Sequence, residues 1–75
     1  MKDKKGIVKI DFGKNLKLLR KARGITQVEF AQAFNISKAT IAYYELDKRQ
    51  PNLEMLVKIA NYFDVSTDYL LNNEK

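Results

Sequence analysis

The sequence contains neither cysteine nor histidine, and each absence narrows the chemistry available to the protein. Without cysteine, disulfide bonds and thiolate metal sites are excluded. Without histidine, the usual general base and the usual zinc ligand are missing. The carboxylates and hydroxyls that remain show no catalytic or metal-binding spacing. We therefore expect no enzymatic activity, no metal site, no cofactor and no small-molecule ligand.

Long apolar runs are also absent from the 75 residues. No run approaches the roughly 20 apolar residues that a membrane-spanning helix needs, and the N-terminus has no hydrophobic signal core. These absences predict a protein without a membrane partner that works in the cytoplasm. A chain of this length is expected to form one small domain, which buries roughly 60% of its unfolded surface.

Positive charge is concentrated at one end of the chain. Residues 1–24 carry nine Lys or Arg against Asp3 and Asp11, a net charge of +7, whereas residues 25–75 carry a net charge of −2. Such asymmetry is typical of a protein that binds a polyanion, usually nucleic acid. A basic tail that only increases solubility explains the charge equally well, so charge alone leaves both interpretations open.

Helix start and stop signals divide the chain into five short helices, at about residues 12–23, 27–34, 38–46, 53–63 and 67–71. The expected N-caps are Asp11, Thr26, Ser37, Asn52 and Ser66, and Glu29 completes a capping box with Thr26. Gly24 and Asn35 tolerate the left-handed conformation that ends a helix, and Pro51 prevents continuation. The fold class is therefore all-α. The domain spans residues 11–75, after a basic arm of residues 1–10 in which "GIVKI" is the one candidate edge strand.

Four of these helices show an apolar face for the core. The expected core residues are Phe12, Leu16 and Leu19, then Phe30, Ala31 and Phe34, and then Leu53, Leu56, Ile59, Ala60 and Phe63. The last short helix carries Tyr69, Leu70 and Leu71. In the two longer helices the core residues recur with the spacing of about 3.6 residues that places side chains on one side of a helix.

The helix over residues 38–46 has a different pattern. Ile41 and Tyr44 fall on one side as anchors to the core, and the opposite side collects Ala39, Ala42, Tyr43 and Leu46, with Lys38 at its margin. A solvent-facing surface normally carries charged residues, whereas this one is slim and uncharged. The major groove of B-DNA admits such a helix, and there alanine and leucine can meet thymine methyls while lysine donates to guanine. A face packed against another helix or a second subunit is the alternative.

The residues around this helix have the spacing of a helix-turn-helix. Counting from Gln27 as the first of twenty residues, the small residue Ala31 is fifth and Asn35 is ninth. Apolar residues occupy the fourth, eighth, tenth, fifteenth and eighteenth places: Phe30, Phe34, Ile36, Ile41 and Tyr44. With these positions, the segments "LRKARGITQVEFAQAFNIS", "KATIAYYE", "KRQP" and "LVKIANYFDVSTDYLL" resemble the phage-repressor and Cro-like (XRE-type) helix-turn-helix family. The resemblance implies a compact lambda-repressor-like domain.

The resemblance also implies a role for individual residues. Gln27 would clamp a phosphate, and Thr40, Lys48 and Arg49 would lie near the DNA backbone. Lys38, Ala39 and Tyr43 would face base edges, as would Ala42 from its place on the helix. Arg20 would form a structural ion pair with Glu45. The family usually has Gly where Asn35 and Asp47 stand, and Asp47 adds a negative charge close to the expected phosphate path.

These expectations define the predicted function: a sequence-specific regulator of transcription that binds double-stranded DNA. Because one helix reads only a few base pairs, we expect a homodimer on an operator whose half-sites lie about 34 Å apart. Tyr62, Tyr69 and Leu71 are candidates for the dimer surface, although they can equally close the monomer core. The alternative function is a protein-interaction module, such as an antitoxin-like partner, on the same fold.

Overall fold

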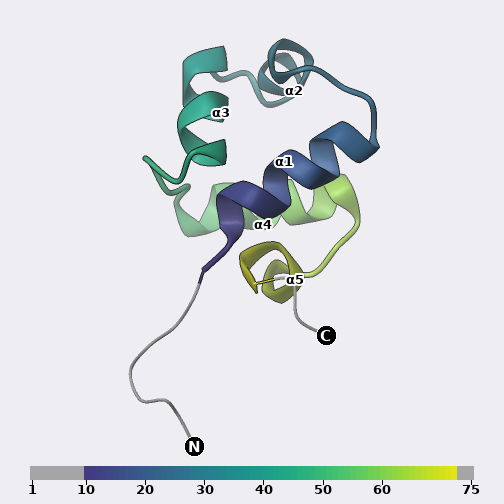
Figure 1. Ribbon diagram of the computed structural model, residues 1–75, viewed down its shortest axis with the longest axis vertical. Helices are drawn as coiled ribbons and strands as arrows, with labels where there is room; N and C mark the ends of the chain where they lie inside the picture. Colours follow the sequence, from purple (N-terminus) through teal and green to yellow (C-terminus); the bar gives the residue numbers. More distant parts are fainter. Residues whose placement is uncertain (1–9, 73–75) are drawn as a thin grey trace, which may run out of the picture.

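The computed structural model describes residues 10–72, and this part of the chain forms five helices and no strand (Figure 1). The helices are α1 (Phe12–Ala22), α2 (Gln27–Phe34), α3 (Lys38–Glu45), α4 (Leu53–Phe63) and α5 (Thr67–Asn72). Every bound lies within one residue of its predicted place, and the predicted all-α class is confirmed. Residues 1–9 of the predicted arm, with most of its candidate strand, lie outside the described residues, as do residues 73–75.

Side-chain caps fix where four of the helices begin. The hydroxyl of Thr26 accepts the amide of Glu29 at 3.0 Å, and the Glu29 carboxylate accepts the amide of Thr26 at 2.8 Å. This is the predicted capping box. Ser37, Asn52 and Ser66 accept the amides three residues later in the same way, at 2.8 to 3.1 Å. Each cap satisfies an amide that has no partner inside its helix, so these starts depend on local sequence.

The predicted side-chain cap at Asp11 is wrong. Asp11 precedes α1, but its side chain makes no capping hydrogen bond there, and its backbone (φ −108°, ψ 34°) lies outside the extended region typical of N-caps. The backbone amide of Asp11 instead donates to the carbonyl of Leu71 in α5 at 2.6 Å. Contact with α5 therefore fixes the start of α1, and a local sequence pattern does not record such a contact.

Left-handed residues follow the first four helices. Gly24, Asn35, Asp47 and Asp64 have φ angles between 56° and 70°. The left-handed geometry that the sequence predicts at Gly24 and Asn35 is confirmed. Asp47, where the resemblance implies that glycine is usual, is left-handed as well. Asp64 was not anticipated. Its amide donates to the carbonyl of Asn61 at 3.1 Å and closes α4.

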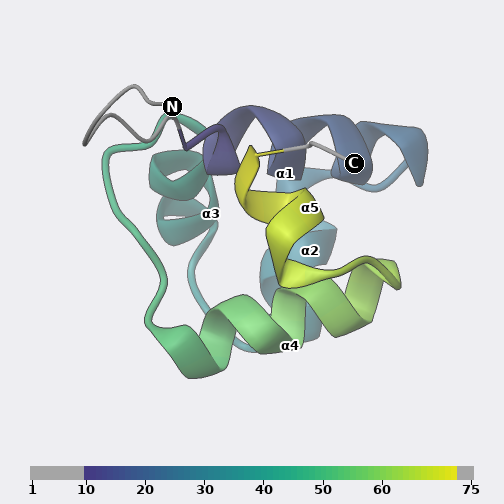
Figure 2. The same ribbon diagram turned by 90° about the horizontal axis from the view of Figure 1, so that it is seen from below.

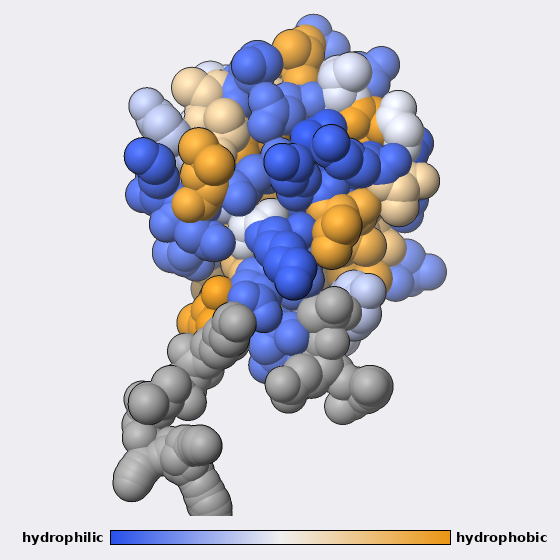
Figure 3. All heavy atoms as spheres, viewed as in Figure 1, coloured by the Kyte–Doolittle hydropathy of each residue, from blue (hydrophilic) through white to orange (hydrophobic). Residues whose placement is uncertain are grey.

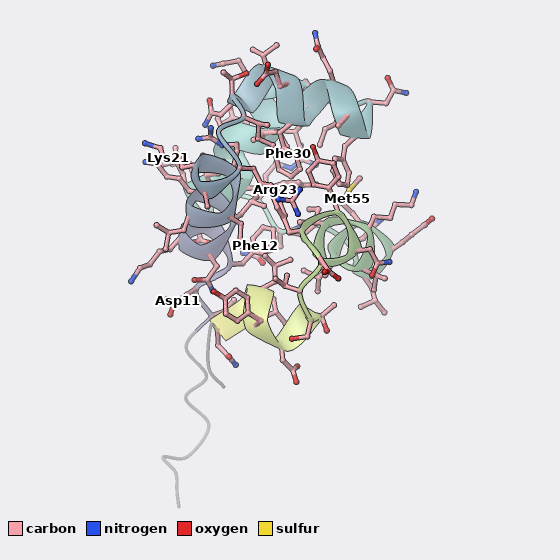
Figure 4. The ribbon with its side chains drawn as sticks, turned by 90° about the vertical axis from the view of Figure 1, so that its right-hand side faces the viewer. Asp11, Phe12, Lys21, Arg23, Phe30 and Met55 are labelled. Carbon is pink, nitrogen blue, oxygen red and sulfur yellow. The ribbon has the colours of Figure 1, made fainter. Side chains whose placement is uncertain are left out.

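The helices enclose one aromatic-rich core. Helix α3 packs on α1 and α2, and α5 lies between α1 and α4 (Figure 2). Phe12 and Phe30 point into the interior, whereas Lys21 points away from it (Figure 4). The largest fully buried side chains are Phe12, Leu16, Phe30, Ile41, Ile59 and Leu70. Among residues 10–72, no helix is long and apolar enough to cross a membrane.

The core prediction for Leu53 is wrong. Leu53 is 76% exposed, while Met55 and Leu56 pack against the core and Ile59 is fully buried. Leu53 is the first residue of α4 and follows its cap Asn52 directly. The first residue of α4 thus lies beyond the core, and the helical period alone does not reveal where the covering helices end.

Candidate nucleic-acid interface

The outer face of α3 is bare, slim and uncharged. Tyr43 is 45% exposed and Leu46 is 64% exposed. Lys38 and Ala39 are also exposed, and Ala42 is half-buried between the two sides of the helix. On the inner side, Ile41 and Tyr44 are buried, and the ring of Tyr44 meets Phe12 edge-on with a centroid distance of 5.9 Å. Two anchors therefore hold α3 while its neutral face stays accessible.

Cationic side chains flank this neutral face at both ends. Lys38 begins α3, and Lys48 and Arg49 follow its end; all three are exposed. An α-helix with its side chains is about 10–12 Å across, which is similar to the width of the major groove of B-DNA. The arrangement places a surface suited to base edges between charges suited to phosphates.

At the start of α3, Ser37 and Thr40 bond to each other. The amide of Thr40 donates to the Ser37 hydroxyl at 3.1 Å, and the two hydroxyls are 2.9 Å apart. Thr40 is expected near the DNA backbone, and its own backbone amide is already bonded to Ser37. Thr40 as a whole is half-buried.

A buried network joins α3 to α1 and α2. Arg20 Nε donates to Glu45 Oε2 at 2.6 Å and Arg20 Nη2 donates to Oε1 at 3.2 Å, so the structure contains the ion pair in bidentate form. The side chains of Arg20 and Glu45 are only 9% and 3% exposed. Arg20 Nη1 also donates to the Ile25 carbonyl at 2.8 Å. Satisfied in this way, the pair fixes the end of α3 against α1.

Gln27 belongs to the same network. Its amide nitrogen donates to Glu45 Oε1 at 3.0 Å, and the side chain is half-buried at the start of α2. No local sequence pattern indicates this contact, because it joins residues 18 positions apart. Glu45 thus holds both Arg20 and Gln27, and it orients the amide that was expected to meet a phosphate.

The end of α3 carries a turn that the sequence predicted only in part. The amide of Lys48 donates to the Tyr43 carbonyl at 2.8 Å and that of Asp47 donates to the Tyr44 carbonyl at 3.1 Å. These two bonds form a Schellman motif, with Asp47 at the left-handed position. The Asp47 carboxylate accepts the amide of Gly13 in α1 at 3.0 Å. The charge that was expected close to the phosphate path is therefore bonded to α1.

The candidate dimer residues have mixed environments. Tyr62 and Tyr69 are 37% and 39% exposed, and Leu71 is half-buried against the core. The ring of Tyr62 also packs on Phe30 with a centroid distance of 5.6 Å. On the face drawn in Figure 3, hydrophobic residues form separate patches among hydrophilic ones. Leu71 contributes to the monomer core, while part of each tyrosine stays accessible.

Two short capped helices joined by a left-handed residue, the second with a bare outer face, define a helix-turn-helix domain. A helix-turn-helix family model matches residues 16–70, and the chain belongs to this family.

Regulators of transcription are among its relatives. The HTH-type transcriptional regulator ImmR of Bacillus subtilis (strain 168) is 41% identical over 66 residues, which cover 88% of this chain and 52% of ImmR. The chain spans about half the length of the curated relatives it matches.

Solved structures of regulators have the same fold. A transcriptional regulator from Listeria innocua superposes with a TM-score of 0.80 at 33% identity, over 85% of this chain and 60% of that one. The P22 c2 repressor, in complex with synthetic operator 9T, superposes with a TM-score of 0.78 at 27% identity, over 84% of this chain and 96% of that one. The chain therefore has the lambda-repressor-like fold that the sequence predicted.

Proposed function

We propose that the protein is a sequence-specific regulator of transcription that binds double-stranded DNA with α3 in the major groove. The observation that carries this proposal is the neutral outer face of α3, which stays exposed between Lys38 and the Lys48–Arg49 pair. The P22 c2 repressor, with the same fold, binds an operator, which supports the proposal. Such a protein would act in the cytoplasm without enzymatic activity.

The residues divide into two roles under this proposal. Lys38, Ala39, Ala42 and Tyr43 read base edges, and Leu46 adds apolar surface at the end of the same face. Gln27, Thr40, Lys48 and Arg49 contact phosphates and set affinity without reading sequence. Glu45 accepts a hydrogen bond from Gln27. The ion pair between Arg20 and Glu45 therefore also helps to orient the Gln27 side chain that contacts a phosphate.

Two copies of the chain are proposed to bind one operator. A single α3 reads only a few base pairs, so useful specificity requires two half-sites about 34 Å apart on one face of the duplex. The accessible parts of Tyr62 and Tyr69 are candidates for the contact between the copies.

The experiment that tests the proposal begins with selection from a pool of random duplexes, followed by mobility-shift titration at two salt concentrations. Lys48→Ala should weaken binding to selected and random duplexes alike and reduce the salt slope by about 1, because one phosphate contact is lost. Lys38→Ala should weaken binding to the selected duplex by roughly 5- to 150-fold and change the preferred bases, as expected for a base contact worth about 1–3 kcal/mol.

Lys58→Ala is the matched control, because Lys58 is an exposed lysine on α4 paired with Glu54 at 3.6 Å. It should leave both affinities close to those of the wild type. A shift that is absent, or that does not weaken with salt, would contradict DNA binding and favour the protein-interaction module.

A further inference from the structure

Helix α1 receives a cap from a residue far away in the sequence. Its own N-cap residue, Asp11, supplies no side-chain capping bond there. The amide of Gly13, in the first turn, instead donates to Asp47 Oδ1 at 3.0 Å, across 34 positions of sequence. A carboxylate at the start of a helix also interacts favourably with the helix dipole. Asp47 therefore stabilises α1 from the end of α3.

Asp47 has this role in spite of an unfavourable backbone. Its φ angle of 59° lies in the left-handed region, which favours glycine. The hydrogen bonds of the Schellman motif use only backbone atoms, so glycine would form the same turn without strain. Within residues 10–72, the Asp47 side chain accepts this one hydrogen bond, from the Gly13 amide. The bond gives a physical reason for a carboxylate at this place.

The backbones of α1 and α3 approach each other closely at this contact. A Cβ atom added to Gly13 would lie 2.6 Å from the Glu45 carbonyl oxygen and 2.7 Å from that of Tyr44. The first turn of α1 thus abuts the last carbonyls of α3 directly. Asp47 fixes this contact at Gly13. Arg20 lies seven residues later, about 10 Å along α1, and fixes a second point of contact with α3 through Glu45.

We propose that Asp47 is a positioning residue for DNA binding: by accepting the Gly13 amide it fixes the angle of α3 on α1. That angle sets how the outer face of α3 and the following Lys48 and Arg49 meet the duplex. The inference rests on the proposed function. It assigns Asp47 a role through Gly13 and requires no contact between Asp47 and DNA.

Two substitutions separate positioning from stability. Asp47→Gly removes both the strain and the carboxylate, and because these effects are of similar size and opposite sign, the melting temperature should stay near that of the wild type. Asp47→Asn keeps an oxygen acceptor for Gly13 while it removes the negative charge.

The readouts are amide hydrogen exchange at Gly13 and the ratio of affinities for selected and random duplexes. Asp47→Gly should abolish protection of the Gly13 amide and lower the affinity ratio by about tenfold, the discrimination of a single good base contact. Asp47→Asn should retain protection and restore the ratio to within about twofold of the wild type, with tighter binding to every duplex because a negative charge is gone.

The outcomes distinguish this inference from the proposed function. An Asp47→Gly protein that folds, loses protection at Gly13 and keeps the wild-type affinity ratio would overturn the positioning role. A low ratio in Asp47→Asn despite retained protection would also overturn it. Failure of the wild-type protein to bind any duplex would instead overturn the proposed function, and this inference with it.

Discussion

Replacing Glu45 by alanine is expected to lower the free energy of unfolding by about 3 kcal/mol, because it leaves the buried Arg20 charge without its partner. The side chain of Arg20 is only 9% exposed, so water cannot fully replace the carboxylate. Arg20 retains one bond to the Ile25 carbonyl, which keeps the loss at the lower end for buried pairs. Urea unfolding followed by circular dichroism measures the change.

Glu54→Ala is the matched control for this substitution. Glu54 pairs with Lys58 at 3.6 Å, one helical turn away, but both side chains are exposed. Solvent screens such pairs, so the control should change the free energy of unfolding by no more than about 0.5 kcal/mol. Equal effects of Glu45→Ala and Glu54→Ala would contradict a structural role for the buried pair.

Replacing Gly13 is expected to lower the free energy of unfolding about as much as replacing Glu45. Helix propensity alone predicts that Gly13→Ala stabilises α1 by about 1 kcal/mol. The added Cβ would, however, lie 2.6 and 2.7 Å from two backbone carbonyl oxygens, which cannot turn aside as a flexible side chain would. Helices α1 and α3 must therefore move apart, and we expect a net loss of about 2–3 kcal/mol, as for overpacked cores. Thermal and urea unfolding measure whether Gly13→Ala raises or lowers the free energy of unfolding.

Gly24→Ala provides the comparison. Gly24 has a φ angle of 70°, but among the described residues no atom beyond its own chain neighbours lies within 4 Å of an added Cβ. Gly24→Ala should lower the free energy of unfolding by about 1–2 kcal/mol from backbone strain alone. It should leave α3 in place and DNA binding nearly unchanged. Gly13→Ala should instead lose DNA binding as well as stability. A Gly13→Ala protein as stable as the wild type would contradict the close contact between α1 and α3.

The features that the sequence predicted well depend on neighbouring residues. The caps at Thr26, Ser37 and Asn52 each join atoms three residues apart. The left-handed turn at Asn35 also follows from what one residue tolerates. Such bonds leave a pattern in the sequence because both partners lie within one helical turn.

The features that the sequence missed depend on contacts between distant segments. No local pattern joins Asp47 to Gly13, or Gln27 to Glu45. Asn15 is a further example: it is buried, and its amide nitrogen donates to the carbonyls of Tyr69 and Leu70 at the end of the chain. An asparagine between lysine and leucine on a helix gives no signal of such a partner.

The ion pair between Arg20 and Glu45 lies between these two cases. The two residues are 25 positions apart, and in the sequence only the resemblance to a known family connects them. The base-reading and phosphate-binding roles stay predictions, because the exposed neutral face of α3 describes the protein without DNA. Leu53 follows the periodic apolar pattern of α4, but its side chain lies outside the core.

Mapping backbone amide chemical shifts on addition of the selected duplex tests most directly whether α3 enters the major groove. We predict that the largest changes fall on residues 38–46, with further changes at Gln27, Lys48 and Arg49, and that α5 changes little. If residues 38–46 keep their free-state shifts while the duplex binds elsewhere, α3 does not enter the groove, and the proposed mode of recognition is wrong.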